Sequence, residues 1–320
     1  MDKVKYTWLF TSLLAALIVG CAGNKSLVEN RTVVADVLEG GPGRHFLWKV
    51  SDENSHVWVL GSIHFADTSF YPMDSVIEEA FANASELAVE MNVREDSVNQ
   101  DVVQETLQKG LLPKGTTLNQ VVPSAVWYSL DSLCFAWNLP IAMFKGMRPW
   151  FVSTTLTALA MERIGLDNSL GIDAVLLDRA KDEGKKIVGI ETPAEQIDAM
   201  SGNDESDSSG AYYLRNTLRE ISGLDSMVTR LIRSWKTGDE ALLHLVLNGD
   251  SAVTETDKVF EKKFEEQIYT RRNGKMAQAI ADFLNEDRNV FVVVGVAHLM
   301  LDEDNVISLL KQKGFRVERF

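Results

Sequence analysis

Residues 289–301, NVFVVVGVAHLML, contain the pattern that decides the fold. The run VFVVV predicts a buried strand, because strands covered on both faces read as short, continuous apolar runs. Gly295 ends the run, and His298 follows after two more residues. Residues 57–64, VWVLGSIH, repeat the same order of apolar run, glycine, two residues and histidine. We therefore expect two strands of one sheet that each lead into a histidine.

The segments around these two strands predict an α/β fold. Residues 46–50 and 56–64 flank the polar loop SDENS and predict a β-hairpin. Residues 56–92 then read as strand, turn, helix and strand, which is a βαβ unit. Further strands are expected at residues 187–191 and 315–320. Because strands separated by helices favour parallel pairing, we expect a mixed, largely parallel central sheet with flanking helices.

The middle of the chain, about residues 95–286, mostly shows helical spacing of its apolar residues. The stretches LPKGTT, NLP and MRPW interrupt this pattern. Thr192, Pro193 and Glu195 match a capping box with proline at the first helical position, which predicts the start of a helix. Residues 201–210, SGNDESDSSG, predict a loop. The sequence thus predicts a large helical insertion that forms a lobe beside the sheet.

The overall composition is that of a globular protein. The chain has 320 residues, of which 45% are hydrophobic and 24% are charged, enough for one large domain or two small ones. Its net charge of −14 disfavours nucleic acid as a partner, because the phosphates would be repelled. The sequence leaves the oligomeric state open.

The N-terminus predicts export and a lipid anchor. Residues 1–20 begin with a short basic stretch and continue with the apolar run WLFTSLLAALIVG, which is typical of a signal peptide. Cys21 follows Leu-Ile-Val-Gly, so we expect its lipidation and attachment of the chain to a membrane. Residues 21–42 then form a tether and residues 43–320 the folded domain. We expect a cell-envelope lipoprotein, on the periplasmic face of the outer membrane if the host is Gram-negative.

Three polar residues are expected to meet at one edge of the sheet. His64 and His298 each follow a strand and a glycine, Gly61 or Gly295, that lets a ligand approach the backbone. A crossover helix makes its two strands parallel and usually close neighbours, which places Glu90 beside the first histidine. Two imidazoles and a carboxylate can bind zinc, manganese, cobalt or iron and leave positions open for water. The pattern is therefore compatible with a site for a divalent transition metal, but also with histidines that only bond a loop carbonyl.

Other polar residues leave alternatives open. Glu191 also ends a predicted strand and is an alternative to Glu90 as the carboxylate of the site. It directly precedes a predicted helix start, however, where its charge could instead complement the helix N-terminus. Arg272 and Asn273 lie in TRRNGKMAQAI, where the arginine could hold a carboxylate or an oxyanion, or belong to a solvated basic pair. Three further residues are expected to be structural: His45 and His56 border the hairpin and His244 lies in a helix. Cys134 is expected to be a core residue.

Together these segments resemble the TraB/PrgY/GumN family, in its GumN-like bacterial branch, which is related to the animal Tiki proteins. The resemblance covers about residues 44–320 and rests on motifs in a fixed order. These are LWKV leading into GSIH, LAVEMN, LPKGTTL, RPW, GIDAVLLDRAKDEGKKIVGIETPAEQ, RRNGKMAQAI and FVVVGVAHL with LLKQKGFRV after it. The resemblance implies an α/β fold shared with erythromycin-esterase-like and haem-binding ChaN-like proteins.

The resemblance also implies an activity. Tiki relatives act as metal-dependent proteases through two GxxH motifs and a glutamate. Carried over, these residues are Gly61 with His64, Gly295 with His298, and Glu90, with Arg272 and Asn273 as the RN motif. We therefore expect a membrane-tethered metal-dependent hydrolase that acts as a peptidase. The alternatives are a non-catalytic lipoprotein that binds a peptide or small ligand, and a purely structural envelope protein.

Overall fold

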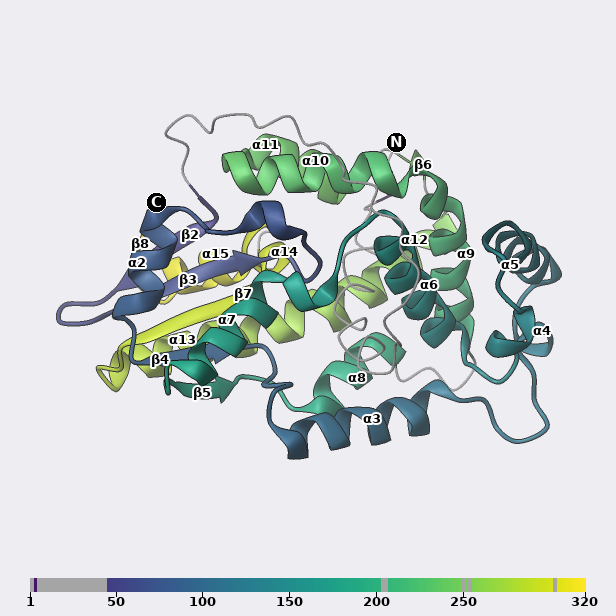
Figure 1. The fold of residues 1–320 in the computed structure, drawn as a ribbon, viewed down its shortest axis with the longest axis horizontal. Helices are drawn as coiled ribbons and strands as arrows, with labels where there is room; N and C mark the ends of the chain where they lie inside the picture. The colour runs from purple at the N-terminus through teal and green to yellow at the C-terminus, as the bar shows by residue number, and fades with distance from the viewer. Residues whose placement is uncertain (1–2, 5–44, 203–206, 249–250, 253–254, 302–303) are drawn as a thin grey trace.

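The computed structural model describes residues 3–4, 45–202, 207–248, 251–252, 255–301 and 304–320. Its centre is a six-stranded sheet with the strand order β5-β4-β7-β3-β2-β8 (Figure 1). The strands are β2 (Leu47–Ser51), β3 (His56–Ser62), β4 (Glu86–Val89), β5 (Lys186–Gly189), β7 (Val290–Gly295) and β8 (Arg316–Arg319). Strands β5, β4, β7 and β3 are parallel, whereas β2 is antiparallel to β3 and β8. The predicted mixed, largely parallel α/β sheet is confirmed.

Strand β7 occupies the middle of the sheet. All six of its residues are buried, as the continuous apolar run predicts, and it pairs with β3 on one side and β4 on the other. The expectation that β3 and β4 are close neighbours is therefore wrong, although they are parallel. The two strands are joined by α2 (Ser75–Asn83), and β7 from the far end of the sequence lies between them. The most apolar strand thus lies in the middle of the sheet, away from both edges.

Helices cover both faces of the sheet. On one face α2 and α7 (Ile172–Asp182) lie side by side, where Arg179 stacks on Phe81 and Phe81 packs edge-on against Phe291 of β7. On the other face lie α13 (Arg271–Asn285) and α15 (Val306–Gln312) (Figure 1). The short helix α14 (Val296–Met300) follows β7 directly. His298 consequently sits in a helical turn just beyond the strand.

The remaining helices form most of the rest of the molecule. They are α3 (Asp96–Gly110), α4 (Leu118–Val121), α5 (Ser124–Trp137), α6 (Pro149–Arg163), α8 (Pro193–Ser201), α9 (Ser208–Glu220), α10 (Leu224–Thr237), α11 (Glu240–Asn248) and α12 (Glu255–Glu265). Short 3-10 turns lie at Thr68–Phe70, Ile141–Phe144, Asn168–Leu170 and Ile221–Gly223, and a π-helical turn at Glu266–Thr270. Helices α4 and α5 form the end of the molecule farthest from the sheet (Figure 1).

The distal helices have a hydrophobic cluster of their own. Leu118, Leu130, Cys134 and Phe144 are buried in it together with the inner side of α6. It is separate from the main cluster, which surrounds the sheet. The structure thus places Cys134 in a core, as the sequence predicts. The two clusters indicate that the helical end packs largely against itself.

Several local predictions can be compared directly with the structure. Thr192 and Glu195 form the expected capping box at the start of α8, with Pro193 at the first helical position. The predicted loop 201–210 is shorter than expected, because α9 already begins at Ser208; residues 203–206 lie outside the described part. Two-residue strands β1 (Lys3–Val4) and β6 (Ser251–Ala252) form a separate antiparallel pair.

The predicted lipidation site, the whole of the predicted tether and the predicted signal peptide from residue 5 onward cannot be compared with the structure. Cys21 and residues 5–44 lie outside the described residues. Among the helices that are described, none is both long enough and apolar enough to span a bilayer.

Candidate functional site

The strand register brings the predicted site residues to one edge of the sheet. Ser62 at the end of β3 pairs with Gly295 at the end of β7, and Val89 at the end of β4 pairs with Val293. His64, Glu90 and His298 each follow one of these three parallel strands within a few residues. Ligands bind at the carboxyl ends of parallel strands, which is where these side chains lie. All three are buried.

The three side chains converge beside Gly295. A β-carbon added to this glycine would lie 3.3 Å from Glu90 Oε1, 3.4 Å from His64 Nε2 and 3.6 Å from His298 Cδ2. His298 Nε2 and Glu90 Oε1 are 3.9 Å apart. Glycine therefore leaves open the space that the three groups share. Gly61 has a different role from Gly295. An added β-carbon at Gly61 would lie 2.8 Å from a methyl carbon of Val296, so this glycine lets α14 pack against β3.

Each imidazole is held through its Nδ1 atom. His64 Nδ1 lies 3.0 Å from Asp173 Oδ1, and His298 Nδ1 lies 2.7 Å from Asn273 Oδ1. The amide nitrogen of Asn273 donates to the carbonyl of Asp304, so its oxygen accepts from His298. This bond puts the proton on Nδ1 of neutral His298 and leaves its Nε2 as an acceptor. Asn273, which the resemblance makes part of the RN motif, lies behind His298 and orients it.

Arg272 joins the two candidate glutamates. Its Nη2 lies 2.6 Å from Glu90 Oε2 and 2.7 Å from Glu191 Oε2, and its Nε donates to Glu191 Oε1 at 2.7 Å. Gln196 donates to both carboxylates at 3.3 and 3.2 Å. Glu191 is thus a partner of Glu90 in one network. The basic pair is split: Arg272 is buried, whereas the side chain of Arg271 is 70% exposed.

The remaining oxygen of Glu90 has a backbone donor. The N–H of Gly295 donates to Glu90 Oε1 at 2.7 Å, which ties β4 to the end of β7. The carboxylate is therefore held by a guanidinium on one oxygen and by an amide on the other. Bonds of this kind to charged groups fix the geometry of a buried carboxylate. Glu90 is a preorganised part of the site.

The two histidines have opposite pKa shifts. Burial lowers the pKa of His64, but the charge and hydrogen bond of Asp173 and the charge of Glu90 together outweigh it, and the pKa is raised. Burial, together with the positive charges of Arg272 and His64, holds the pKa of His298 well below its usual value. Arg272 itself has a raised pKa, since Glu191 and Glu90 overcome the effect of burial. Groups with pKa values pushed apart in one buried site are typical of functional sites.

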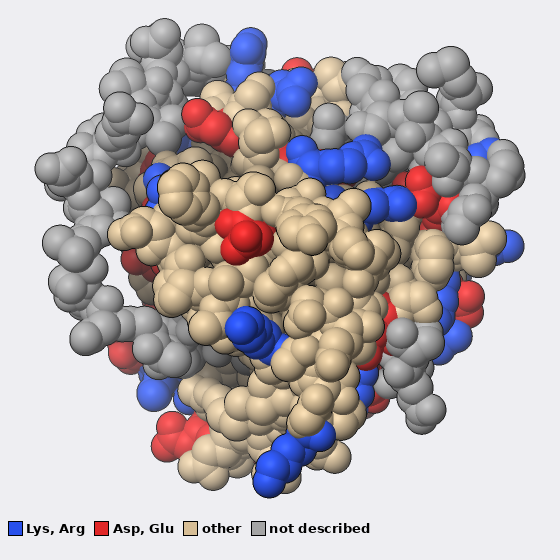
Figure 2. Space-filling model, turned by 90° about the vertical axis from the view of Figure 1, so that its right-hand side faces the viewer, with Lys and Arg blue, Asp and Glu red and all other residues tan. Residues whose placement is uncertain are grey.

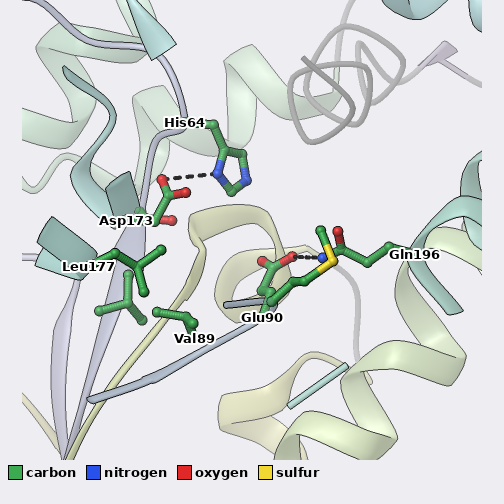
Figure 3. Close-up of a pocket in the computed structure, with 9 residues that line it drawn as sticks. His64, Val89, Glu90, Asp173, Leu177 and Gln196 are labelled. Atoms are coloured by element: carbon green, nitrogen blue, oxygen red, sulfur yellow. Dashed lines mark hydrogen bonds and ion pairs between the residues drawn. The ribbon is translucent and has the colours of Figure 1, made fainter. Parts of the chain in front are cut away.

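A small cavity lies between His64, Glu90, Asp173 and Gln196 (Figure 3). The ring of His64, which follows β3, and the carboxylate of Glu90, which follows β4, reach toward it from opposite sides of β7 (Figure 3). The cavity has a volume of about 10 Å³, which is enough for one water molecule or a single ion. A peptide can reach these groups only if the surrounding side chains move.

Two residues of the site, Asp173 and Gln196, lie outside the two GxxH motifs and were not predicted from the sequence. Asp173, the partner of His64, is the second residue of α7, and Gln196 lies on α8. In the structure the glycine before α7, Gly171, allows a close approach, because an added β-carbon would lie 2.3 Å from the carbonyl oxygen of His64. This close approach places the start of α7, and with it Asp173, against the residues after β3. The segment GIDAV thus carries a site residue that sequence reasoning missed.

The other histidines lie elsewhere. His45 Nε2 is 3.5 Å from Asp74, His56 packs edge-on against Trp58 in the hairpin, and His244 is part of α11. These positions fit the structural roles expected for them.

The donor types beside Gly295 fit a divalent transition metal. Two imidazole nitrogens and a carboxylate are a common ligand set for zinc and also suit manganese, cobalt and iron. In a tetrahedral site, ligand atoms are about 3.4 Å apart, close to the 3.9 Å between His298 and Glu90. Within the described ranges, however, no three His, Cys, Asp or Glu side chains form a ready metal-binding cluster. A metal would compete with the bonds that Arg272 and Gly295 make to Glu90.

Comparison with known proteins identifies relatives. The uncharacterized protein YbaP of Escherichia coli is 24% identical over 159 residues, 48% of this chain and 57% of that protein, so the chain matches only a little over half of it. An uncharacterized protein of Treponema pallidum is 19% identical over 83% of this chain and 80% of its own length. The metalloprotease TIKI2 of Xenopus tropicalis is 22% identical over 85% of this chain and 59% of its own length. No solved structure gives a significant match.

A family model gives a match over a larger part of the chain. It covers residues 46–319, which include the whole six-stranded sheet and each of the residues around Gly295. The chain belongs to the TraB/PrgY/gumN family.

Proposed function

We propose that the protein is a metal-dependent hydrolase and that its substrates are peptides. The observation that carries this proposal is the convergence of His64 Nε2, His298 and Glu90 Oε1 around the position that a β-carbon of Gly295 would occupy. The distant similarity to a metalloprotease of Xenopus tropicalis supports it. Packing alone gives no reason to bury two imidazoles and a carboxylate around one glycine.

In this proposal His64, His298 and Glu90 hold a divalent metal. When bound, such an ion lowers the pKa of a water molecule and polarises the carbonyl to be attacked. Asp173 and Asn273 orient the two imidazoles through Nδ1, as partners behind metal ligands commonly do. Arg272 balances the charge of Glu90 and Glu191, and after local opening its guanidinium is the nearest cation for a substrate carboxylate or an oxyanion.

Metal analysis tests the proposal directly. The purified protein is supplied with manganese, cobalt, zinc or iron, dialysed at neutral pH and analysed for bound metal, and peptide cleavage is measured with and without a chelator. We expect about one ion per chain, loss of cleavage on chelation and loss of both metal and cleavage in His298→Ala. His244→Ala is the matched control, because this histidine lies on α11 and should keep both. A protein that binds none of the four metals contradicts the proposal.

A second candidate function is ligand binding without catalysis. It is favoured by the bonds that already engage both oxygens of Glu90. In this case a peptide or small ligand would bind without turnover, and His298→Ala would change its affinity little. A His298→Ala protein that still binds peptide but has lost measurable cleavage rejects this candidate.

We also propose that the chain is anchored in the cell envelope through Cys21. The support is the sequence alone, namely a basic start and an apolar run that end in a cysteine. Metabolic labelling with a radioactive fatty acid should mark the wild-type chain and leave Cys21→Ser unlabelled. Equal labelling of both would contradict the proposal.

A further inference from the structure

The end of the molecule formed by α4 and α5 is almost free of charge. Residues 112–147 contain Lys114, Asp131 and Lys145 as their only Asp, Glu, Lys or Arg side chains, three in 36 residues, whereas 24% of the whole chain is charged. The segment therefore has a net charge of +1, and the rest of the chain, from −14 minus +1, has −15. Figure 2 looks at this end of the molecule and shows a broad surface on which uncharged residues predominate.

Large apolar side chains are exposed on the same segment. Phe135 is 89% exposed and Tyr128 is 67% exposed, and Met143 in the following turn is 41% exposed. Tyr128 and Phe135 are seven residues apart, which is about two helical turns, so they share one face of α5. Exposed aromatic groups on a surface depleted in charge are typical of interaction sites.

The packing of α5 keeps these side chains at the surface. Its opposite face, with Val126, Leu130 and Cys134, is buried in the distal hydrophobic cluster. The helix ends at Asn138, whose left-handed conformation lets its N–H bond the carbonyls of Cys134 and Phe135. Because α5 is held from both its inner face and its end, Phe135 cannot turn inward without breaking the cluster.

We propose that this surface binds the same surface of a second copy of the chain. We call it the α5 patch and define it by exposed residues of the charge-poor segment, namely Tyr128, Asp131 and Phe135 on α5 and Met143 and Lys145 in the turn that follows. A two-fold pairing lays an apolar centre on an apolar centre, as in interfaces of homodimers. The patch also carries both signs of charge, so Asp131 of one copy can pair with Lys145 of the other.

The charges favour a second copy over other occupants. Two chains with −15 outside this segment repel each other on their other faces, and the segment with net +1 is where they can approach. A lipid surface is disfavoured because Asp131 lies between Tyr128 and Phe135 on the outer face of α5, where it would have to leave water.

Sedimentation of the full chain in density-matched non-ionic detergent measures the association. We expect a concentration-dependent dimer whose dissociation constant rises at least about tenfold in Phe135→Ser, since buried aromatic anchors dominate such interfaces. Val259→Ser is the matched control, because Val259 on α12 is also 68% exposed but lies outside the α5 patch. Circular dichroism confirms that both variants stay folded.

A charge reversal tests the geometry of the pairing. Asp131→Lys and Lys145→Asp should each weaken the dimer, and the double variant should restore it, because a two-fold interface then contains the same pairs with reversed signs. Ser132→Cys, on the exposed face of α5, should form a covalent dimer under mild oxidation faster than Glu286→Cys, which follows α13 at the opposite end of the molecule (Figure 1).

Two results overturn the proposal. One is a monomer at every concentration up to tens of micromolar. The other is a monomer that binds vesicles of anionic phospholipid in a manner that requires Phe135, which would make lipid the occupant.

Discussion

Gly295 is the position where a single added methyl group would lie between the three side chains of the site. We predict that Gly295→Ala folds but loses the metal, because the new carbon occupies the space between Glu90 Oε1 and His64 Nε2 at 3.3 and 3.4 Å. Its backbone angles suit alanine, since φ is −53°. Metal content and cleavage rate are the measurements, and thermal unfolding checks the fold.

Gly274→Ala is the control for this change. Gly274 lies in α13, and an added β-carbon would contact nothing within 4 Å. It should keep the site and gain up to about 1 kcal/mol of stability, because alanine favours a helix over glycine. A Gly295→Ala protein with full metal content and full cleavage would show that the shared space is not used.

The positive charge of Arg272 compensates the negative charges of two buried carboxylates, Glu90 and Glu191. We predict that Arg272→Met lowers the free energy of unfolding by about 3–5 kcal/mol, because Glu90 and Glu191 lose the cation between them. Arg271→Met, at the exposed neighbouring residue, should change it by less than about 0.5 kcal/mol. Chemical denaturation measures both, and equal effects would contradict the ion-pair account.

The repeated order of strand, glycine and histidine was enough to predict two of the residues that meet beside Gly295, and the βαβ unit, whose two strands are parallel, supplied Glu90. His64, His298 and Glu90 follow apolar strands, and strand ends can be located from sequence. Asp173 could not be predicted in this way, because its contact with His64 depends on how α7 docks after a long helical segment. The roles of Glu191 and Arg272 likewise required the tertiary structure, since the two residues lie 81 positions apart.

At the level of elements, α9 carries a buried acid outside the site. Glu220 is 7% exposed, neither of its carboxylate oxygens has a hydrogen-bond partner among the described residues, and burial raises its pKa to about 8. Arg219 opposes this shift and Glu261 of α12 adds to it. Because the folded state holds this proton more tightly than the unfolded state, stability should fall as the pH rises from about 4.5 to about 8.

Glu220→Gln should remove this dependence. The amide cannot ionise, so the variant should be more stable than the wild type at pH 8 by on the order of a few kcal/mol and similar to it below pH 4.5. Thermal unfolding from pH 4 to pH 9 measures the difference. An unchanged slope between the two pKa values would show that Glu220 is ionised in the folded protein.

The elements themselves were largely predictable, but their order in the sheet was not. The apolar run of β7 and the capping box of α8 are local signals and both are found in the structure. The position of β7 between β3 and β4 depends on which strand buries the most apolar surface, and adjacency in sequence does not determine this. The start of α9 at Ser208 was missed, because serines and glycine favour loops unless packing holds them in a helix.

For the whole molecule, the two hydrophobic clusters predict unequal stability. Leu130→Ala should destabilise the distal helices by about 2–5 kcal/mol, because Leu130 is fully buried in their cluster. Hydrogen exchange in α5 should then become faster while exchange in β7 stays slow, since the sheet has its own cluster. Ser132→Ala, on the exposed face of α5, is the control and should change neither. Equal acceleration in both regions would mean that the molecule unfolds as one unit.

The place of β7 in the sheet also affects the order in which the protein can fold during synthesis. Strands β3 and β4 leave the ribosome early, whereas the strand that lies between them, β7, comes some 200 residues later. Until then the facing edges of β3 and β4 have no partner, and such edges expose nascent chains to aggregation and to capture by chaperones. His298 also arrives only after β7. A nascent protein thus has no assembled site until residues 290–298 have been made.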